Sequence, residues 1–167
     1  GPLQAEQTTA RAGQYRPLQL LEAIRSRHAA VAYDGRPAAR DGSVRLRIDI
    51  KPDTAEARVA GDLRAGLAAL REEWDRKALP PERRRQAKEI LDRAERELEE
   101  TLKTLEVQTR CLWQANAHTW FPTQMAEHTE LTYARAGRTY REKREAVTRF
   151  LPPGRNGTIR KPATAGT

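Results

Sequence analysis

Apolar residues recur at helical spacing along much of this chain. The first stripe begins at Pro17 and predicts a short helix over 17–28. A second stripe runs from Val59 to Trp74 with steps of three and four residues, and it predicts a helix over 55–77. Both stripes are narrow, so each helix needs a partner to cover its apolar side.

Two longer stripes follow the break at Pro80-Pro81. From Pro81 a three-four repeat that includes Leu91 and Leu98 predicts a coiled-coil-like helix of about 35 residues. Pro122 interrupts this pattern, which then resumes to about residue 151. Two long amphipathic helices joined by a tight break predict an antiparallel helical hairpin over 81–151.

A different pattern lies between the first two helices. The segment Val44–Ile50 alternates strictly between apolar and polar residues, and a shorter apolar segment, Ala30–Tyr33, precedes it. Alternation bounded by turn residues such as Asp34-Gly35 predicts a β-hairpin. Its core-facing side chains are expected to be Val44, Leu46, Ile48 and Ile50.

These elements predict a mainly α protein. A small N-terminal α-β-hairpin unit is expected to pack on the long antiparallel helical hairpin, and a basic, disordered tail is expected to follow. Gly1-Pro2 is typical of a protease-cleavage scar. The expected organisation is a flexible lead-in (1–16), an α-β-β-α unit (17–77), the helical hairpin (81–151) and the tail (152–167).

Composition narrows the functional classes. The 167 residues are 38% hydrophobic and 32% charged, and aromatic residues make up 5%, so we expect no large cavity for a small-molecule substrate. Cys111 is the sole cysteine, which excludes an intrachain disulfide and favours a reducing, cytoplasmic location. No apolar run is long enough to span a membrane, and no motif indicates a cofactor.

The net charge is concentrated at the C-terminal end. Residues 131–167 contain nine Lys or Arg and two Glu, whereas the first 130 residues are nearly neutral. Such asymmetry favours a polyanionic partner, and nucleic acid, DNA or RNA, is the preferred one. The cations expected to contact phosphate are Arg135, Arg138, Arg141, Lys143, Arg144, Arg149, Arg155, Arg160 and Lys161, with Arg83, Arg84 and Arg85 as a second group.

Alternatives to this interpretation remain open. The basic segment also fits an acidic protein partner or a solvated face. Tyr133 and Tyr140 are seven residues apart, which favours packing over base stacking. Self-association would cover apolar surface on the long helix.

An aromatic cluster near Pro122 is the candidate partner-binding site. Trp113, Trp120 and Phe121 lie where the two long helices are expected to meet. Aromatic side chains dominate binding hot spots, although packing at the end of the helical pair or over the β-hairpin is the simpler role. The cluster supports a second hypothesis, that of a protein-docking or adaptor module.

Two weak resemblances cover parts of the chain. Asp34 and the triplet Asp49-Ile50-Lys51 resemble the metal-binding residues of PD-(D/E)xK nucleases, which implies a metal-dependent nuclease as a minor alternative. Residues 17–73 resemble small α-β-β-α docking domains of the TubC N-terminal type, which capture a partner's terminal peptide with a β-hairpin. That resemblance departs from the family by a long insertion between the strands.

No constellation of catalytic residues accompanies these patterns. The three histidines and Cys111 have no zinc-ligand spacing, and no nucleophile motif or phosphate loop is present. We therefore expect neither a metal nor catalysis. The sequence predicts a non-enzymatic binding or assembly subunit that contacts nucleic-acid phosphate through its Arg-rich C-terminal region.

Overall fold

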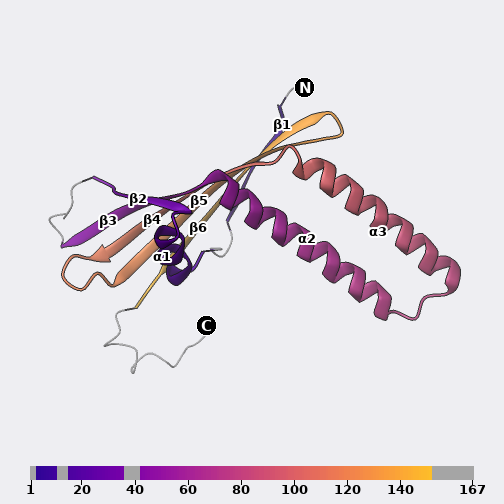
Figure 1. The fold of residues 1–167 in the computed structure, drawn as a ribbon, viewed down its shortest axis with the longest axis horizontal. Coiled ribbons are helices and arrows are strands. Elements are labelled where there is room, and N and C mark those ends of the chain that lie inside the picture. The colour runs from indigo at the N-terminus through magenta and orange to yellow at the C-terminus, as the bar shows by residue number, and fades with distance from the viewer. Residues whose placement is uncertain (1–2, 11–14, 36–41, 152–167) are drawn as a thin grey trace. The chain divides into compact units, whose positions relative to one another are not determined.

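The computed structural model describes residues 3–10, 15–35 and 42–151. Within these residues three helices and six strands form a mixed α/β protein (Figure 1). The strands form one sheet in the order β1-β6-β5-β4-β3-β2. In chain order the elements are β1 (Leu3–Ala10), α1 (Pro17–Arg25), β2 (Ala29–Tyr33), β3 (Ser43–Ile50), α2 (Pro52–Arg76), α3 (Pro81–Leu102), β4 (Glu106–Asn116), β5 (Pro122–Arg135) and β6 (Arg138–Arg149).

The chain divides into two compact units. The first, the helical-hairpin unit, contains α2, α3 and the parts of β4, β5 and β6 that lie within 51–108 and 129–143. The second, the sheet unit, contains α1, β2, β3 and the remaining parts of β4, β5 and β6. Each unit buries apolar residues of its own, such as Val59 and Leu91 in the first and Leu20 and Ile48 in the second.

The predicted β-hairpin is present in the sheet unit. β2 pairs antiparallel with β3, and β3 pairs antiparallel with β4. Ile48 and Ile50 are buried, as is Val44, whereas Arg45 is exposed. The alternation read from the sequence therefore identified the core-facing side of β3.

The expectation of a mainly helical, coiled-coil-like bundle was wrong. The predicted long helix ends at Leu102, and the chain then forms β4. Leu105 and Leu112 continue the helical spacing, but Leu112 is only half-buried. The buried positions of β4 alternate instead, and most carry β-branched, aromatic or small side chains that suit a strand: Val107, Thr109, Cys111, Trp113 and Ala115.

The second half of the predicted helical hairpin is also a pair of strands. β5 and β6 are joined by Ala136-Gly137, whose positive φ values of 51° and 77° are those of a two-residue hairpin turn. Tyr133 and Tyr140 stack across the two strands with ring centroids 5.5 Å apart. The seven-residue spacing that suggested one helical face thus comes from pairing across this turn.

The helical hairpin that does exist is formed by α2 and α3 (Figure 1). Arg64 of α2 donates two hydrogen bonds of 2.8 Å to the Glu99 carboxylate of α3. Arg71 contacts Asp92 at 3.0 Å and Glu95 at 3.3 Å. Leu91 is the buried residue of α3, and these ion pairs add polar contacts between the two helices.

The expected lead-in and tail have different outcomes. Residues 3–10, predicted to be a flexible lead-in, form β1 at one edge of the sheet. The tail predicted over 152–167 lies outside the described residues.

The β5–β6 turn gives a direct test of the strand assignment. Gly137→Ala should lower the free energy of unfolding by about 1–2 kcal/mol, because an L-residue is strained at its φ of 77°. No atom lies within 4 Å of a Cβ built there, so crowding does not contribute to this loss. Ala136→Asn should raise stability by up to about 1 kcal/mol, since Asn tolerates this conformation. Urea unfolding measures both, and a neutral Gly137→Ala would contradict the turn.

Candidate nucleic-acid interface

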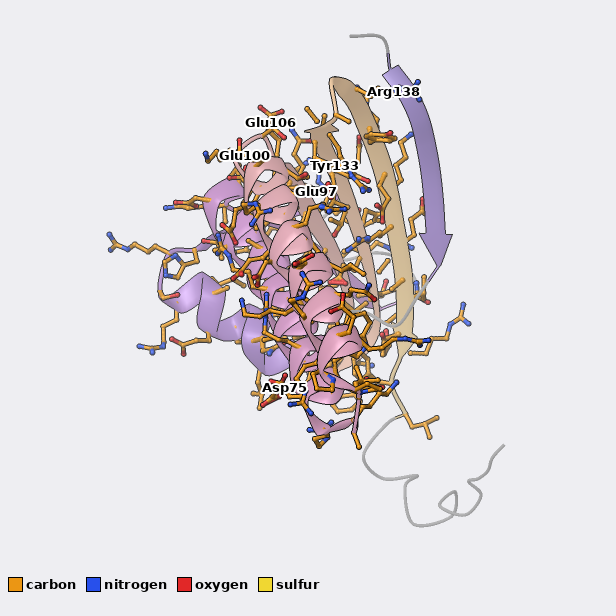
Figure 2. The ribbon with its side chains drawn as sticks, turned by 90° about the vertical axis from the view of Figure 1, so that its right-hand side faces the viewer. Asp75, Glu97, Glu100, Glu106, Tyr133 and Arg138 are labelled. Carbon is orange, nitrogen blue, oxygen red and sulfur yellow. The ribbon has the colours of Figure 1, made fainter. Side chains whose placement is uncertain are left out.

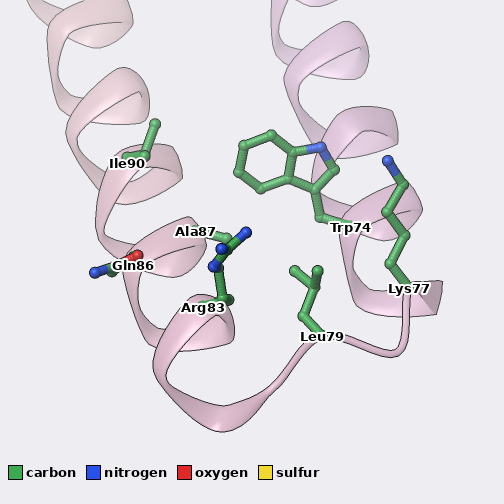
Figure 3. Close-up of a pocket in the computed structure, with 7 residues that line it drawn as sticks. All are labelled: Trp74, Lys77, Leu79, Arg83, Gln86, Ala87 and Ile90. Carbon is green, nitrogen blue, oxygen red and sulfur yellow. The ribbon is translucent and has the colours of Figure 1, made fainter.

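The tip of the α2–α3 hairpin carries an open pocket. α2 ends at Arg76, α3 begins at Pro81, and the Leu79 N–H donates to the Lys77 carbonyl at 2.9 Å within the short connection. Pro80 and Pro81 suit the start of α3, where an N–H has no helical partner. The pocket has a volume of about 300 Å³, and Figure 3 shows the residues that line it: Trp74, Lys77, Leu79, Arg83, Gln86, Ala87 and Ile90.

The three arginines at the start of α3 have separate environments. Arg85 is paired with Glu82 and, at 2.8 Å, with Glu89. Arg84 donates to the Leu79 carbonyl at 3.3 Å. Arg83 lines the pocket and lies between the two helices (Figure 3). Arg83 is thus the one of these three predicted phosphate-binding arginines that lines the pocket.

Lys77 and Arg83 give the pocket a positive charge. From residue 75 to 89 the chain has six Lys or Arg and three carboxylates, Asp75, Glu82 and Glu89. Within the described residues, neither Lys77 nor Arg83 has a carboxylate within salt-bridge distance. Trp74 is half-buried and adds an aromatic wall beside these cations. The pocket therefore offers two cations and a π face to an anionic, planar ligand.

Sequence reasoning missed Trp74, Lys77 and Gln86. Trp74 was assigned to the apolar stripe of its helix, which describes its half-buried state but not its place at the pocket. The available signal was the Pro80-Pro81 break three residues after Lys77, since a reversal there brings both helix ends together.

The basic residues of β6 do not share one face. The expectation of an Arg-rich C-terminal helix was wrong, because this segment forms the strand β6. Alternate residues of a strand point to opposite sides of the sheet. Arg138 and Arg144 therefore lie on one side, and Arg141, Lys143 and Arg149 lie on the other. Arg135, Arg138, Arg141 and Arg149 are exposed, whereas Lys143 and Arg144 are half-buried.

The surroundings of the β5–β6 turn also contain acidic side chains. Figure 2 shows Glu97, Glu100 and Glu106 at the same end of the helical-hairpin unit as Arg138, with Asp75 at the other end. The Ala134 N–H donates to the Thr104 hydroxyl at 2.8 Å, which ties this end of β5 to the segment after α3. This end of the unit therefore carries both acidic and basic side chains, and the Glu100 carboxylate is paired with Lys103 at 2.8 Å. Arg155, Arg160 and Lys161 lie outside the described residues.

The predicted aromatic cluster is split by the structure. Trp113 is buried on β4 with 7% exposure, Phe121 is half-buried, and Trp120 is 49% exposed in the β4–β5 loop. The side-chain oxygen of Asn116 accepts hydrogen bonds from the backbone N–H groups of His118 and Thr119. Trp120 has a φ of 60°, an uncommon conformation for a bulky residue, and its indole is exposed in this hydrogen-bonded loop.

The residues of the nuclease alternative do not converge. Asp34 bonds through its backbone N–H to Arg45, four positions along β3 from Asp49. That spacing corresponds to about 13 Å along a strand. The Asp49 carboxylate is instead bonded to Arg110 at 2.8 Å. No group of three or more metal-ligating side chains occurs in the described part of the chain.

Cys111 is a core residue of the sheet unit. Its side chain is fully buried opposite Ile48, and burial together with the carboxylates of Glu127 and Asp49 raises the pKa of its thiol to about 12. A thiol with this pKa is protonated at neutral pH and is a poor nucleophile.

Comparison with known proteins gives no match from which a function could be inferred. No model of a known protein family, no curated protein and no solved structure matches this chain. None of the helices among the described residues has the length and apolar character needed to cross a membrane. The tip pocket combines an aromatic wall with two cations.

The two tryptophans of the split cluster should respond oppositely to substitution. Trp120→Gly should leave the free energy of unfolding unchanged or raise it by up to about 1 kcal/mol, because it relieves a positive φ and removes an exposed side chain. Trp113→Ala should lower it by about 3–5 kcal/mol. Urea unfolding compares them, and a loss above about 1 kcal/mol for Trp120→Gly would show that this indole packs within the core.

Proposed function

We propose that this chain is a non-enzymatic nucleic-acid-binding protein that contacts the phosphate backbone with the tip of its α2–α3 hairpin. The observation that carries this proposal is the tip pocket, in which Lys77 and Arg83 lie beside Trp74. Guanidinium and ammonium groups donate to phosphate oxygens, and most of the affinity of such contacts comes from release of counterions. An aromatic face beside cations is the combination that single-strand binders use.

Two cations of the tip have no carboxylate partner among the described residues. Both ends of the unit carry carboxylates: Glu97, Glu100 and Glu106 lie at the end with Arg138, and Asp75 lies at the other end (Figure 2). At the tip, Arg85 and Lys88 are paired with carboxylates, but Lys77 and Arg83 are free to meet a ligand. A phosphate approaching the tip therefore replaces water and counterions rather than an existing ion pair, so less electrostatic energy is lost on binding.

The contact is proposed to read the backbone rather than the sequence of bases. The tip supplies point charges and one half-buried ring, and phosphate contacts of this kind position a protein without selecting a sequence. The exposed arginines of β5 and β6, Arg135, Arg138, Arg141 and Arg149, would add long-range attraction.

Reversal of the tip charges should weaken nucleic-acid binding. The variant combines Lys77→Glu with Arg83→Glu, and the control combines Arg93→Glu with Arg96→Glu, two exposed arginines of α3 outside the pocket. Both variants change the net charge equally. The tip variant should bind at least about 10-fold more weakly, with a salt slope lower by about two, while the control changes by less than about threefold. Fluorescence anisotropy with labelled single- and double-stranded DNA and RNA, across about 50 to 300 mM salt, measures this.

Three outcomes would contradict the proposal. Absence of binding by the unchanged protein at the lowest salt would exclude the function itself. Equal losses in the tip variant and its control would show that only total charge matters. Tighter binding of a labelled poly-glutamate peptide than of any nucleic acid, with the same dependence on Lys77 and Arg83, would assign the tip to an acidic protein. Circular dichroism checks that both variants keep their helices.

A further inference from the structure

β2 forms one edge of the sheet and is unusually apolar for such a position. It is the last strand in the sheet order, and its five residues, Ala29–Tyr33, carry no charge (Figure 1). Val31 is 44% exposed and Tyr33 is 50% exposed. Edge strands are normally protected from pairing with other chains by charged side chains, proline or a bulge. None of these devices is present among the five residues of β2.

The backbone of β2 has hydrogen-bonding groups directed outward. The Asp34 N–H donates to the Arg45 carbonyl at 2.9 Å, and the register continues with Ala32 opposite Arg47 and Ala30 opposite Asp49. In an antiparallel ladder the hydrogen-bonded pairs alternate with non-bonded pairs. The N–H and C=O groups of Ala29, Val31 and Tyr33 therefore point away from β3. No described strand lies on that side.

We propose that this edge pairs antiparallel with β2 of a second copy of the chain, so that two sheets join across a two-fold axis at Val31. With Val31 opposite Val31 of the second copy, Ala29 lies opposite Tyr33 and Ala30 lies opposite Ala32. Each of the three outward-facing residues then meets another outward-facing residue. All of these backbone groups are satisfied by ladder hydrogen bonds without any change in the strand.

The side chains at this register are complementary in size and charge. The large Tyr33 meets the small Ala29, and the small Ala30 meets Ala32. At the ends, Asp34 of one copy comes next to the turn of the second copy that carries Arg27 and His28, which immediately precede β2. The acidic end of each β2 strand thus lies next to the basic end of the other, and the two-fold axis repeats this contact. This self-complementarity favours a second copy over a different protein as the occupant.

Exposed apolar residues also occur on α1, the helix that precedes this edge strand. Val31 and Tyr33 lie opposite Ile48 and Leu46, on the side of the sheet that carries the core, and α1 contacts β2. Leu18 is 78% exposed and Leu21 is 52% exposed on that helix. A two-fold axis perpendicular to the sheet keeps both α1 helices on the same side. The exposed leucines of both α1 helices and the two copies of Val31 then lie on the same side of the joined sheet, where they can bury apolar surface.

The mass of the full chain in solution tests this dimer. At about 100 µM, light scattering after gel filtration should give twice the 18.9 kDa of one chain, with dissociation on dilution. Val31→Pro removes an outward N–H and spares the β3 ladder, and Val31→Lys places a charge on the axis. Each should weaken the dimer at least about 10-fold. The control Val147→Lys, at a 58% exposed valine of β6, should leave the mass unchanged.

A cysteine at the axis gives an independent test of the register. Val31→Cys places two Cα atoms about 5.5 Å apart in the dimer, which is within the range of a disulfide. Tyr33→Cys places its two copies about 13 Å apart along the strands, so it should not cross-link. The buried thiol of Cys111 does not compete. A monomeric unchanged protein, a dimer that survives both Val31 substitutions, or equal cross-linking at 31 and 33 would overturn the proposal.

Discussion

Pairing between β3 and β4 is the constraint on which the rest of the structure depends. Ile50 pairs with Thr109, so the segment between them leaves and returns at neighbouring points of the ladder. Two helices that begin and end at neighbouring points must run antiparallel. The Glu56 carboxylate also accepts a hydrogen bond from the Val107 N–H at 3.4 Å, which joins the first turn of α2 to the start of β4. The hairpin therefore presents its connection, and with it the tip pocket, at the end remote from these attachments.

The elements that sequence predicted correctly are those with one unambiguous period. β3 alternates from Val44 to Ile50, and α2 as well as the start of α3 follow a helical stripe that begins after a proline. β4 satisfied two periods at once, because Leu105 and Leu112 fit a helix while Val107 to Ala115 fit a strand. Packing decided between them, since β3 supplies backbone partners from Thr109 to Asn116 that no local pattern reveals.

The candidate site was partly predictable for the same reason. The sequence identifies Arg83, Arg84 and Arg85 as cations at a helix N-terminus. Which of them is paired depends on the acceptor groups that lie near each one in the fold. Glu82 and Glu89 pair with Arg85, and the loop carbonyl of Leu79 receives Arg84. Trp74 and Lys77 come from the other helix, so their place beside Arg83 follows from the reversal of the chain.

The two proposed surfaces are coupled through the net charge of +8. Two copies of such a chain repel each other, and the uncharged β2 edge reduces that repulsion only at the point of contact. A polyanion bound to either copy neutralises part of the charge and so favours association of the copies. By thermodynamic reciprocity, association must then favour binding of the polyanion by the same factor. Two linked tips on one strand would also bind more tightly than one, provided that the strand reaches both.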